Sequence, residues 1–174
     1  MTTAIPTRLL RLVMVAGVAV LLVPAFGVAQ VPYERILDAA SEPGNWLTYS
    51  GTYGAQRYST LEQIDRENVG RLQPAWVYQA RSLQKFEVSP LVVDGVMYIT
   101  EAPSDATALD LRTGRPIWSY RRSLPQGIVT CCGQVNRGVA LLDDQVFIGT
   151  VDAHLVALDA RTGQVRWDVE VADY

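Results

Sequence analysis

The chain is poor in the side chains that build most protein metal centres. Its 174 residues include only two cysteines and one histidine. The cysteines, Cys131 and Cys132, are neighbours in the sequence, and the single histidine is His154. Structural zinc sites take four Cys and His ligands at characteristic spacings. The sequence contains no Cys/His cluster of this kind, so the paired cysteines need another explanation.

Basic side chains are also scarce. The full chain has 15 Lys and Arg against 18 Asp and Glu, a formal net charge of −3. Without residues 1–29, which hold two arginines and no acid, 13 basic and 18 acidic side chains remain and the charge is −5. Nucleic-acid-binding domains carry clustered positive charge. The charge pattern therefore does not point to a nucleic-acid partner.

Residues 1–29 contain a long apolar run next to basic residues. Arg8 and Arg11 precede the apolar stretch 12–23, and Gly27-Val28-Ala29 offers small residues for cleavage. This order is typical of a secretory signal peptide. The stretch is shorter than the ~20 residues that span a bilayer, which argues against an uncleaved anchor. We expect cleavage after Ala29 and export of the rest of the chain.

Residues 30–80 are predicted to form an N-terminal arm. Apolar residues at helical spacing predict a short helix from Val31 to Ala40, ended by Glu42-Pro43-Gly44. The pair Thr60-x-x-Gln63 resembles a capping box and predicts one more brief helical turn. Alternating large and polar side chains predict a strand from Leu72 to Gln79, which we expect to belong to the blade that closes a ring.

The strongest internal signal is a repeat. Residues 92–118 align without a gap on residues 141–167, an offset of 49. Self-similarity at a period of this size indicates a repeat architecture. The alignment has nine identical positions: Asp94/Asp143, Ile99/Ile148, Ala108/Ala157, Leu109/Leu158, Asp110/Asp159, Arg112/Arg161, Thr113/Thr162, Gly114/Gly163 and Trp118/Trp167.

Each copy is predicted to form four short antiparallel strands. Asp94-Gly95 between apolar runs is a strong hairpin signal. Four-stranded units at this spacing are typical of propeller blades, which need neighbours to cover both faces. We therefore expect residues 81–174 to hold the first two blades of a longer propeller, at about 87–121 and 137–171. In the first copy the predicted strands are Leu91 to Val93, Val96 to Thr100, Thr107 to Leu111 and Pro116 to Tyr120.

Two turn motifs carry the first family resemblance. Ala108-x-Asp110-x-x-Thr113-Gly114-x-x-x-Trp118 recurs as Ala157-x-Asp159-x-x-Thr162-Gly163-x-x-x-Trp167. The Asp can cap a tight turn, the Gly can adopt positive φ, and the Trp can dock on a neighbouring blade. The motif resembles the tryptophan-docking motif of quinoprotein propellers. This resemblance implies an all-β, eight-bladed propeller that carries pyrroloquinoline quinone (PQQ).

Adjacent cysteines are awkward disulfide partners. Their Cα atoms are about 3.8 Å apart, whereas ordinary disulfides have roughly 4.4 to 6.8 Å. A Cys131–Cys132 bond would close a small, strained and rigid ring. The alternatives are two separately buried thiols or bonds to other chains. Export to an oxidising compartment favours the bond between the two neighbours.

The segment around the cysteines carries a second, more specific resemblance. Cys131-Cys132 followed by Val135-Asn136-Arg137-Gly138 looks like the PQQ contact loop of soluble periplasmic methanol and ethanol dehydrogenases. Residues 86–98 are similar to their first-blade strand, whose glutamate is here Glu87, and residues 45–76 resemble their N-terminal arm. The resemblance implies that PQQ contacts Glu87, Cys131, Cys132, Val135 and Arg137. It also implies that Cys131 and Cys132 form a disulfide that packs on the quinone.

The same resemblance implies an activity and partners. Such enzymes oxidise primary alcohols to aldehydes in the periplasm, pass a hydride to the quinone and deliver electrons to a cytochrome c. A Ca²⁺ or lanthanide ion and the catalytic aspartate come from later blades, so no catalytic or metal-binding residue is assigned in this chain. The chain alone is expected to be inactive, and a homodimer is one assembly that the resemblance allows.

Structural alternatives exist for each candidate residue. Arg137 could be a surface arginine that opens the second blade, and Glu87 a solvated residue beside Lys85. His154 is expected to be a solvated loop residue in the Asp152-Ala153 turn. A rival from another functional class is an exported, non-enzymatic propeller scaffold, and a third is a degenerate quinoprotein without its metal site. The scaffold does not account for the paired cysteines with Arg137 and Glu87.

Overall fold

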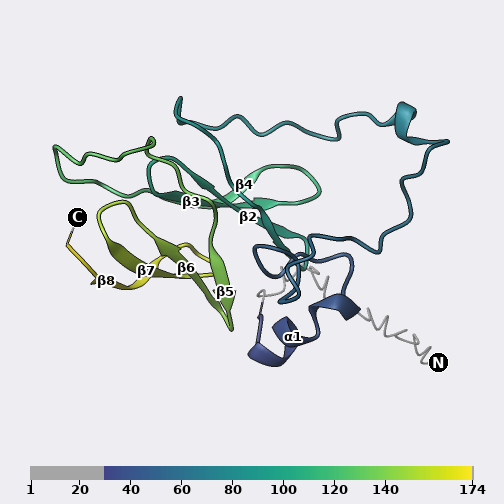
Figure 1. The fold of residues 1–174 in the computed structure, drawn as a ribbon, viewed down its shortest axis with the longest axis horizontal. Coiled ribbons are helices and arrows are strands. Elements are labelled where there is room, and N and C mark those ends of the chain that lie inside the picture. The colour runs from purple at the N-terminus through teal and green to yellow at the C-terminus, as the bar shows by residue number, and fades with distance from the viewer. Residues whose placement is uncertain (1–29, 174) are drawn as a thin grey trace, which may run out of the picture.

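The predicted repeat folds as two four-stranded antiparallel sheets that face one another (Figure 1). A computed structural model describes residues 30–173, so the expected leader at 1–29 lies outside the described residues. In each sheet the strands follow one another in sequence order. The first sheet contains β1 (Leu91–Val93), β2 (Val96–Glu101), β3 (Asp105–Asp110) and β4 (Pro116–Tyr120). The second contains β5 (Ala140–Leu142), β6 (Gln145–Gly149), β7 (His154–Asp159) and β8 (Val165–Glu170).

The all-β prediction is confirmed, and the predicted strands of the first repeat are found within two residues of their expected ends. The second repeat matches the first in detail. Ala108 pairs with Trp118 and Ala157 with Trp167, and the register shifts immediately after Ala108 and after Ala157. The equivalent turns of the two blades therefore have the same local geometry.

The Asp–Thr–Gly turns that join β3 to β4 and β7 to β8 are closed by their own side chains. Asp110 Oδ1 accepts hydrogen bonds from Thr113 N and Thr113 Oγ1, both at 2.8 Å. Asp159 Oδ1 accepts the equivalent bonds from Thr162 at 2.8 and 2.9 Å. Gly163, at the end of its turn, has a φ of +71°, a region that favours glycine. The predicted capping role of the aspartates is confirmed.

The tryptophan of the first repeat docks on the glycine turn of the second. Trp118 Nε1 donates to Ala160 O at 2.9 Å. A Cβ atom at Gly163 would lie 2.6 Å from the Trp118 ring, so the indole rests directly on the glycine. Trp76 of the arm repeats this contact one blade earlier, since its Nε1 donates to Leu111 O at 2.8 Å and its ring covers Gly114. Trp76 thus acts as the tryptophan of a preceding blade.

The core lies between the two sheets. Tyr98 of the first sheet is buried, and its hydroxyl donates to Ala160 O of the second at 3.3 Å. The Tyr98 and Trp118 rings pack with centroids 6.0 Å apart. The aliphatic part of this core comes from the facing strands of both sheets: Leu91, Val93, Leu141, Val146, Ile148, Val156 and Leu158. Burying these side chains removes the apolar surface that single blades would leave exposed.

A buried ion pair closes the seam between the blades at the end of β4. Arg122 and Asp152 have side chains that are 9% and 3% exposed, and their closest atoms are 2.6 Å apart. Burial alone would raise the pKa of Asp152, but hydrogen bonds from Arg122 and Thr150 hold it below its ordinary value. Arg122 also contacts Asp168 of β8. One arginine thus links the exit from the first blade to the second.

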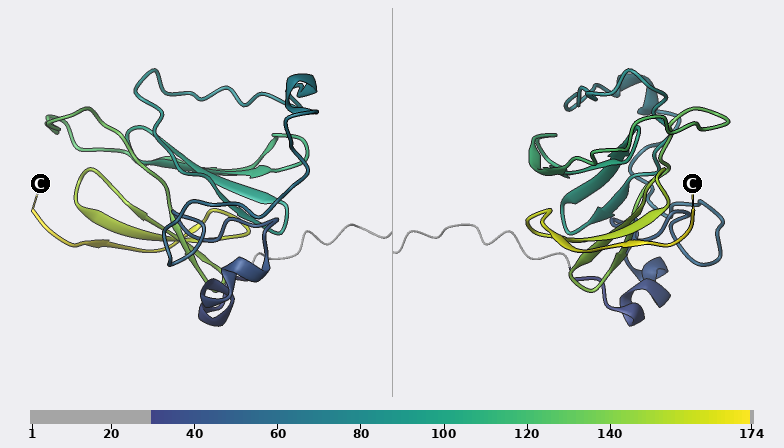
Figure 2. Two further views of the ribbon diagram at one scale, coloured as in Figure 1. Left: turned by 45° about the vertical axis from the view of Figure 1, so that its right-hand side comes forward. Right: turned by 90° about the vertical axis from the view of Figure 1, so that its left-hand side faces the viewer.

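The arm fastens the first hairpin turns of both blades. Val31 and Asp143 exchange two backbone hydrogen bonds, each of 2.8 Å. Trp46 and Val92 exchange two more, at 2.8 and 3.0 Å. Arg35 forms ion pairs with Glu42 and with Asp94, the residue that opens the β1–β2 turn. The arm and the two blades are therefore joined by both backbone and side-chain contacts. Figure 2 shows the helical part of the arm beneath the sheets in both views.

The helical predictions for the arm need correction. The helix predicted from Val31 to Ala40 is shorter and divided, with α1 at Tyr33–Leu37 and a 3₁₀ turn, η1, at Ala39–Ser41. It divides at Asp38, where the hydrogen-bond pattern changes. Asp38 N donates to Glu34 O, four residues back, whereas Ser41 N donates to Asp38 O, three residues back. No side chain caps its first turn. A helix of this length gains little from intrinsic propensity, so the docking of Ile36 and Ala39 decides its form.

The capping box predicted at Thr60 and Gln63 is wrong. Residues 60–65 contain no helix, and the 3₁₀ turn η2 lies later, at Val69–Arg71. Asp65 Oδ1 instead accepts hydrogen bonds from Glu67 N and Asn68 N. Such local bonds compete with helix formation. Leu61 and Ile64 are exposed, so no buried face stabilises a helix there.

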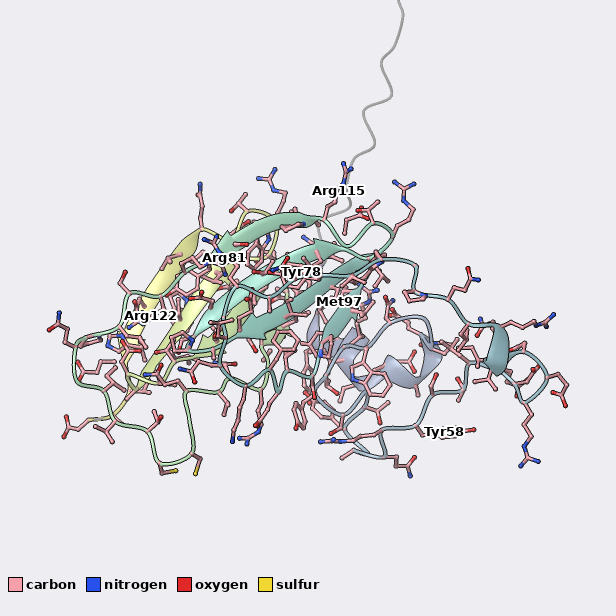
Figure 3. The ribbon with its side chains drawn as sticks, turned by 90° about the horizontal axis from the view of Figure 1, so that it is seen from above. Tyr58, Tyr78, Arg81, Met97, Arg115 and Arg122 are labelled. Carbon is pink, nitrogen blue, oxygen red and sulfur yellow. The ribbon has the colours of Figure 1, made fainter. Side chains whose placement is uncertain are left out.

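The strand predicted from Leu72 to Gln79 is not formed, because it has no sheet partner among residues 30–173. Residues 72–79 are held instead by side-chain hydrogen bonds and by a backbone hydrogen bond from Arg81, just after the segment. Tyr78 Oη and Arg81 N donate to the carboxylate of Glu101 at 2.7 and 2.6 Å. Glu101 is only 1% exposed. Figure 3 shows Tyr78 and Arg81 over the first sheet.

The glycine beneath the Trp118 indole gives the first testable prediction. Gly163→Ala combines a positive φ with a Cβ position 2.6 Å from the indole. Strain and overpacking together should lower the free energy of unfolding by about 2 kcal/mol or more. The measurement is the thermal midpoint of a full-length protein that carries this chain. Gly44→Ala is the matched control, since no atom lies within 4 Å of its Cβ position; equal midpoints would contradict the docking contact.

The carboxylate that caps the second blade's turn gives a prediction about pH. Hydrogen bonds from Arg166, then from Thr162, lower the pKa of Asp159 from 3.8 to about 2. A group whose folded pKa is lowered stabilises the fold above its unfolded pKa and loses that effect as the pH falls. Asp159→Asn should therefore lower the thermal midpoint of unfolding at pH 6. Between pH 4 and 2, the midpoint of this variant should decrease less than that of the wild type. In Asp143→Asn, which alters a carboxyl without a described hydrogen bond, the fall should remain.

Candidate functional site

The residues predicted to form the site come from two segments on either side of the first blade. One is residues 85–89, which lead into β1. The other is the long connection from β4 to β5, residues 121–139, which projects from the sheets and then returns (Figure 1). We call this connection the cysteine loop. The two segments meet where the loop re-enters the second blade.

Glu87 and Arg137 form an ion pair at this meeting point. Glu87 Oε2 accepts from Arg137 Nη2 at 3.1 Å, although the two residues are 50 positions apart. Their side chains are 36% and 64% exposed, so both remain accessible. The two charged residues predicted to belong to one site are therefore brought into contact. Glu87 is exposed, as the alternative of a solvated residue beside Lys85 expects, and it also has a specific partner in Arg137.

Backbone contacts hold the two segments together beside this pair. Ser89 N donates to Arg137 O at 3.1 Å. Gly138 follows with a φ of +133°, and a Cβ there would lie 3.0 Å from Ser89 O. Only glycine combines this conformation with so close an approach. The Arg137-Gly138 pair of the motif thus supplies one candidate side chain for the site and one residue without a side chain.

Cys131 and Cys132 are both exposed, so the interpretation as buried thiols is wrong. Their Sγ atoms lie 2.6 Å apart in the dithiol form. A disulfide requires roughly 2.05 Å, and the bond between the two stays a prediction. Hydrogen bonding with Cys131 raises the pKa of the Cys132 thiol, against a smaller opposing effect of the nearby Arg137 charge. Lys85 Nζ lies 3.5 Å from Cys132 O, which brings the loop next to the segment that carries Glu87.

Val135 lies in the cysteine loop between the thiols and the ion pair. Its backbone N–H donates to Gly133 O at 3.0 Å and closes a tight turn. The side chain is partly buried. The structure thus places Val135 in the same loop as the other candidates, and its predicted contact with a cofactor stays a prediction.

Sequence reasoning missed several polar neighbours of the site. The Arg57 guanidinium lies 4.8 Å from the centre of the Tyr49 ring. Hydrogen bonding with Arg57, then with Ser89, lowers the pKa of the Tyr49 hydroxyl. These three residues line an open cavity of about 440 Å³ with Trp46, Val88, Pro90, Val92 and Met97. The contact between Tyr49 and Arg57 could not be predicted from the sequence, because the two residues are eight positions apart in an irregular loop and form no recognisable motif.

His154 was predicted to be a solvated loop residue, and this is wrong. It begins β7, and its Nδ1 lies 2.6 Å from Asp168 Oδ1 of β8. This pair belongs to the Arg122 and Asp152 cluster that closes the seam between the blades. Across residues 30–173, no group of three or more His, Cys, Asp or Glu side chains could hold a metal ion. No helix in that part of the chain is long and apolar enough to cross a membrane.

Comparison with known proteins relates this arrangement to a family. Residues 46–168 match the family model described as the β-propeller domain of glucose, ethanol and alcohol dehydrogenases. The dehydrogenase subunit of a quinone-dependent alcohol dehydrogenase of Komagataeibacter europaeus is 47% identical over 138 residues, which is 78% of this chain and 19% of the relative. A quinone-dependent 1-butanol dehydrogenase of Thauera butanivorans is 41% identical over 167 residues, 95% of this chain and 27% of the relative.

Solved structures agree with these sequence matches. A quinohemoprotein alcohol dehydrogenase of Pseudomonas putida HK5 superimposes with a TM-score of 0.78 at 46% identity, covering 84% of this chain and 22% of that one. A europium-containing methanol dehydrogenase gives a TM-score of 0.74 at 35% identity, over 80% and 25%. The chain thus spans about a fifth to a quarter of these proteins and forms part of a propeller. It belongs to the family of PQQ-dependent, or quinoprotein, alcohol dehydrogenases.

Proposed function

We propose that this chain is the N-terminal part of a periplasmic PQQ-dependent dehydrogenase that oxidises primary alcohols to aldehydes. The observation that carries the proposal is the meeting of Glu87 and Arg137 beside the exposed pair of cysteines. Neither the blade repeat nor the core requires these residues. A propeller that serves only as a scaffold would need the tryptophan contacts but not this cluster.

The side chains fit the chemistry of the cofactor. PQQ is a flat ortho-quinone with three carboxylates. A guanidinium has five N–H donors, and only Nη2 of Arg137 contacts an acid in the described part of the chain. The remaining donors can therefore bind a carboxylate as a planar fork. Glu87 holds this fork from one side, which restricts the directions from which an anion can approach.

Each candidate residue receives a distinct role in the proposal. When bound, PQQ supplies an acceptor for a hydride from the alcohol carbon. Cys131 and Cys132, joined as a disulfide, provide a rigid apolar platform for one face of the quinone. Arg137 binds an oxygen of the cofactor, Glu87 orients Arg137 and accepts a hydrogen bond at the cofactor edge, and Val135 adds apolar contact.

The catalytic and metal-binding residues of the proposed enzyme lie outside residues 1–174. A Ca²⁺ or lanthanide ion would act there as a Lewis acid, and an aspartate would take the alcohol proton. The europium in one structurally similar methanol dehydrogenase supports a test with lanthanides as well as calcium. Electrons would pass to a cytochrome c, and the expected leader would direct export to the periplasm. The same activity test, repeated with different primary alcohols, identifies the preferred substrate. A homodimer is the assembly that belongs to this proposal.

The test uses a full-length protein that carries this chain, purified with PQQ and either Ca²⁺ or a lanthanide. We expect a bound-quinone absorption spectrum and reduction of an artificial electron acceptor that depends on added primary alcohol. A folded propeller without bound quinone under either metal would contradict the proposal and favour a scaffold. Bound quinone without alcohol-dependent reduction would favour a degenerate enzyme.

The role of Arg137 gives a quantitative prediction. Arg137→Ala removes a charge-assisted contact with a carboxylate and should weaken PQQ binding by about 10- to 100-fold. The measurement is a titration of the metal-loaded apoprotein with PQQ, followed by protein fluorescence. Arg71→Ala, which alters an arginine of the arm outside the site, should bind PQQ like the wild type. Equal affinities of Arg137→Ala and the wild type would exclude Arg137 from the site.

The predicted disulfide can be tested without the cofactor. The intact mass of the protein purified from the periplasm should be lower by two hydrogens than that of the reduced protein, because Cys131 and Cys132 are bonded to each other. Peptide mapping after alkylation identifies the bonded pair. Cys131→Ser should abolish the mass difference. Alkylation of both thiols without prior reduction would show that the cysteines are free.

A further inference from the structure

Asn136 has no assigned role, yet it makes more structural contacts than its neighbours in the cysteine loop. Its Nδ2 donates to Gly149 O at 2.9 Å, at the end of β6. Its Oδ1 accepts from Gly138 N at 3.1 Å, across the intervening Arg137. Its backbone oxygen accepts from Thr100 Oγ1 of β2 at 3.2 Å. The residue before Arg137 is thus bonded to both blades.

These contacts fix the backbone on both sides of Arg137. Thr100 is only 1% exposed, so its hydroxyl has no water to replace Asn136 as a partner. Ser89 N bonds Arg137 O from the other side. The Arg137 side chain, by contrast, is 64% exposed and touches one described partner, Glu87. The position of the Arg137 side chain is therefore set by its hydrogen-bonded main chain and not by packing around the guanidinium.

We propose that Asn136, assisted by Thr100, is a positioning residue that directs the Arg137 guanidinium toward a carboxylate of the bound quinone. This inference rests on the proposed function. An arginine side chain loses considerable rotamer freedom when it binds an anion. A fixed backbone lowers the total entropy cost of binding, because only the side-chain rotamers remain to be ordered. Asn136 acts through Arg137 and does not itself touch the cofactor.

The experiment is a double-mutant cycle in the full-length protein. Asn136→Ala should weaken PQQ binding to the metal-loaded apoprotein by about tenfold, the size of one hydrogen bond to a charged group. In the Arg137→Ala background the same substitution should cause no further loss, because the side chain that it positions is absent. Titration with PQQ, followed by protein fluorescence, gives the four affinities without any measurement of turnover.

A second variant guards against a folding defect in Asn136→Ala. Thr100→Val keeps the shape of the buried side chain, removes only the bond to Asn136 O, and should weaken PQQ binding to a smaller extent. Thr107→Val is its matched control. It removes a hydroxyl that is also 1% exposed and bonded within the same sheet, to Ser119 at 3.1 Å. Thr107→Val should leave the affinity for PQQ unchanged.

The outcomes separate this inference from the proposed function. Equal losses from Asn136→Ala with and without Arg137 would show a general structural role and overturn the inference while the wild type still binds PQQ. Unchanged affinity in both Asn136→Ala and Thr100→Val would overturn it as well. A wild-type protein that binds no PQQ would overturn the proposed function and this inference together.

Discussion

The contact between an indole and the glycine turn of the next repeat is the constraint on which the structure depends. Trp118 covers Gly163 and donates to Ala160 O, which fixes the separation of the two sheets. The apolar side chains between the sheets then fill a gap whose width is already determined. A larger residue in place of the glycine would push the blades apart and open that core. Packing and hydrogen bonding therefore act at the same point.

The candidate site is a product of this spacing. The cysteine loop leaves the first blade and enters the second, and its last residues are bonded to both. Arg137 meets Glu87 because the loop returns past residues 87–89 before β5 begins. Arg122 and Asp152, just after β6, form a buried pair, which costs desolvation energy unless it is fully hydrogen-bonded. Both polar clusters thus engage the segment at the end of β6, one through Gly149 and the other through Asp152.

The sequence predicted the parts of the fold that depend on local chemistry. The strands were found because strand periodicity and the Asp–Thr–Gly turns are short-range signals that occur twice. The arm was predicted poorly, since its short helical segments depend on docking, and residues 72–79 lack the sheet partner that a strand requires. Glu87 and Arg137 were predicted from a motif. The bonds of Asn136 with Thr100 and Gly149, and of His154 with Asp168, link distant segments and leave no pattern in a single sequence.

The indole contact also has a direction. Two tryptophans donate to the turn of the repeat that follows them, Trp76 to Leu111 O and Trp118 to Ala160 O. Contacts of this head-to-tail kind apply the same rotation at every step, so a series of them either closes into a ring or continues as a helix. The rotation between neighbouring blades, to which the indole contact contributes, therefore sets how many blades complete the circle. An error of a few degrees at each contact would accumulate around the ring, so its closure tolerates less variation than any single blade interface requires.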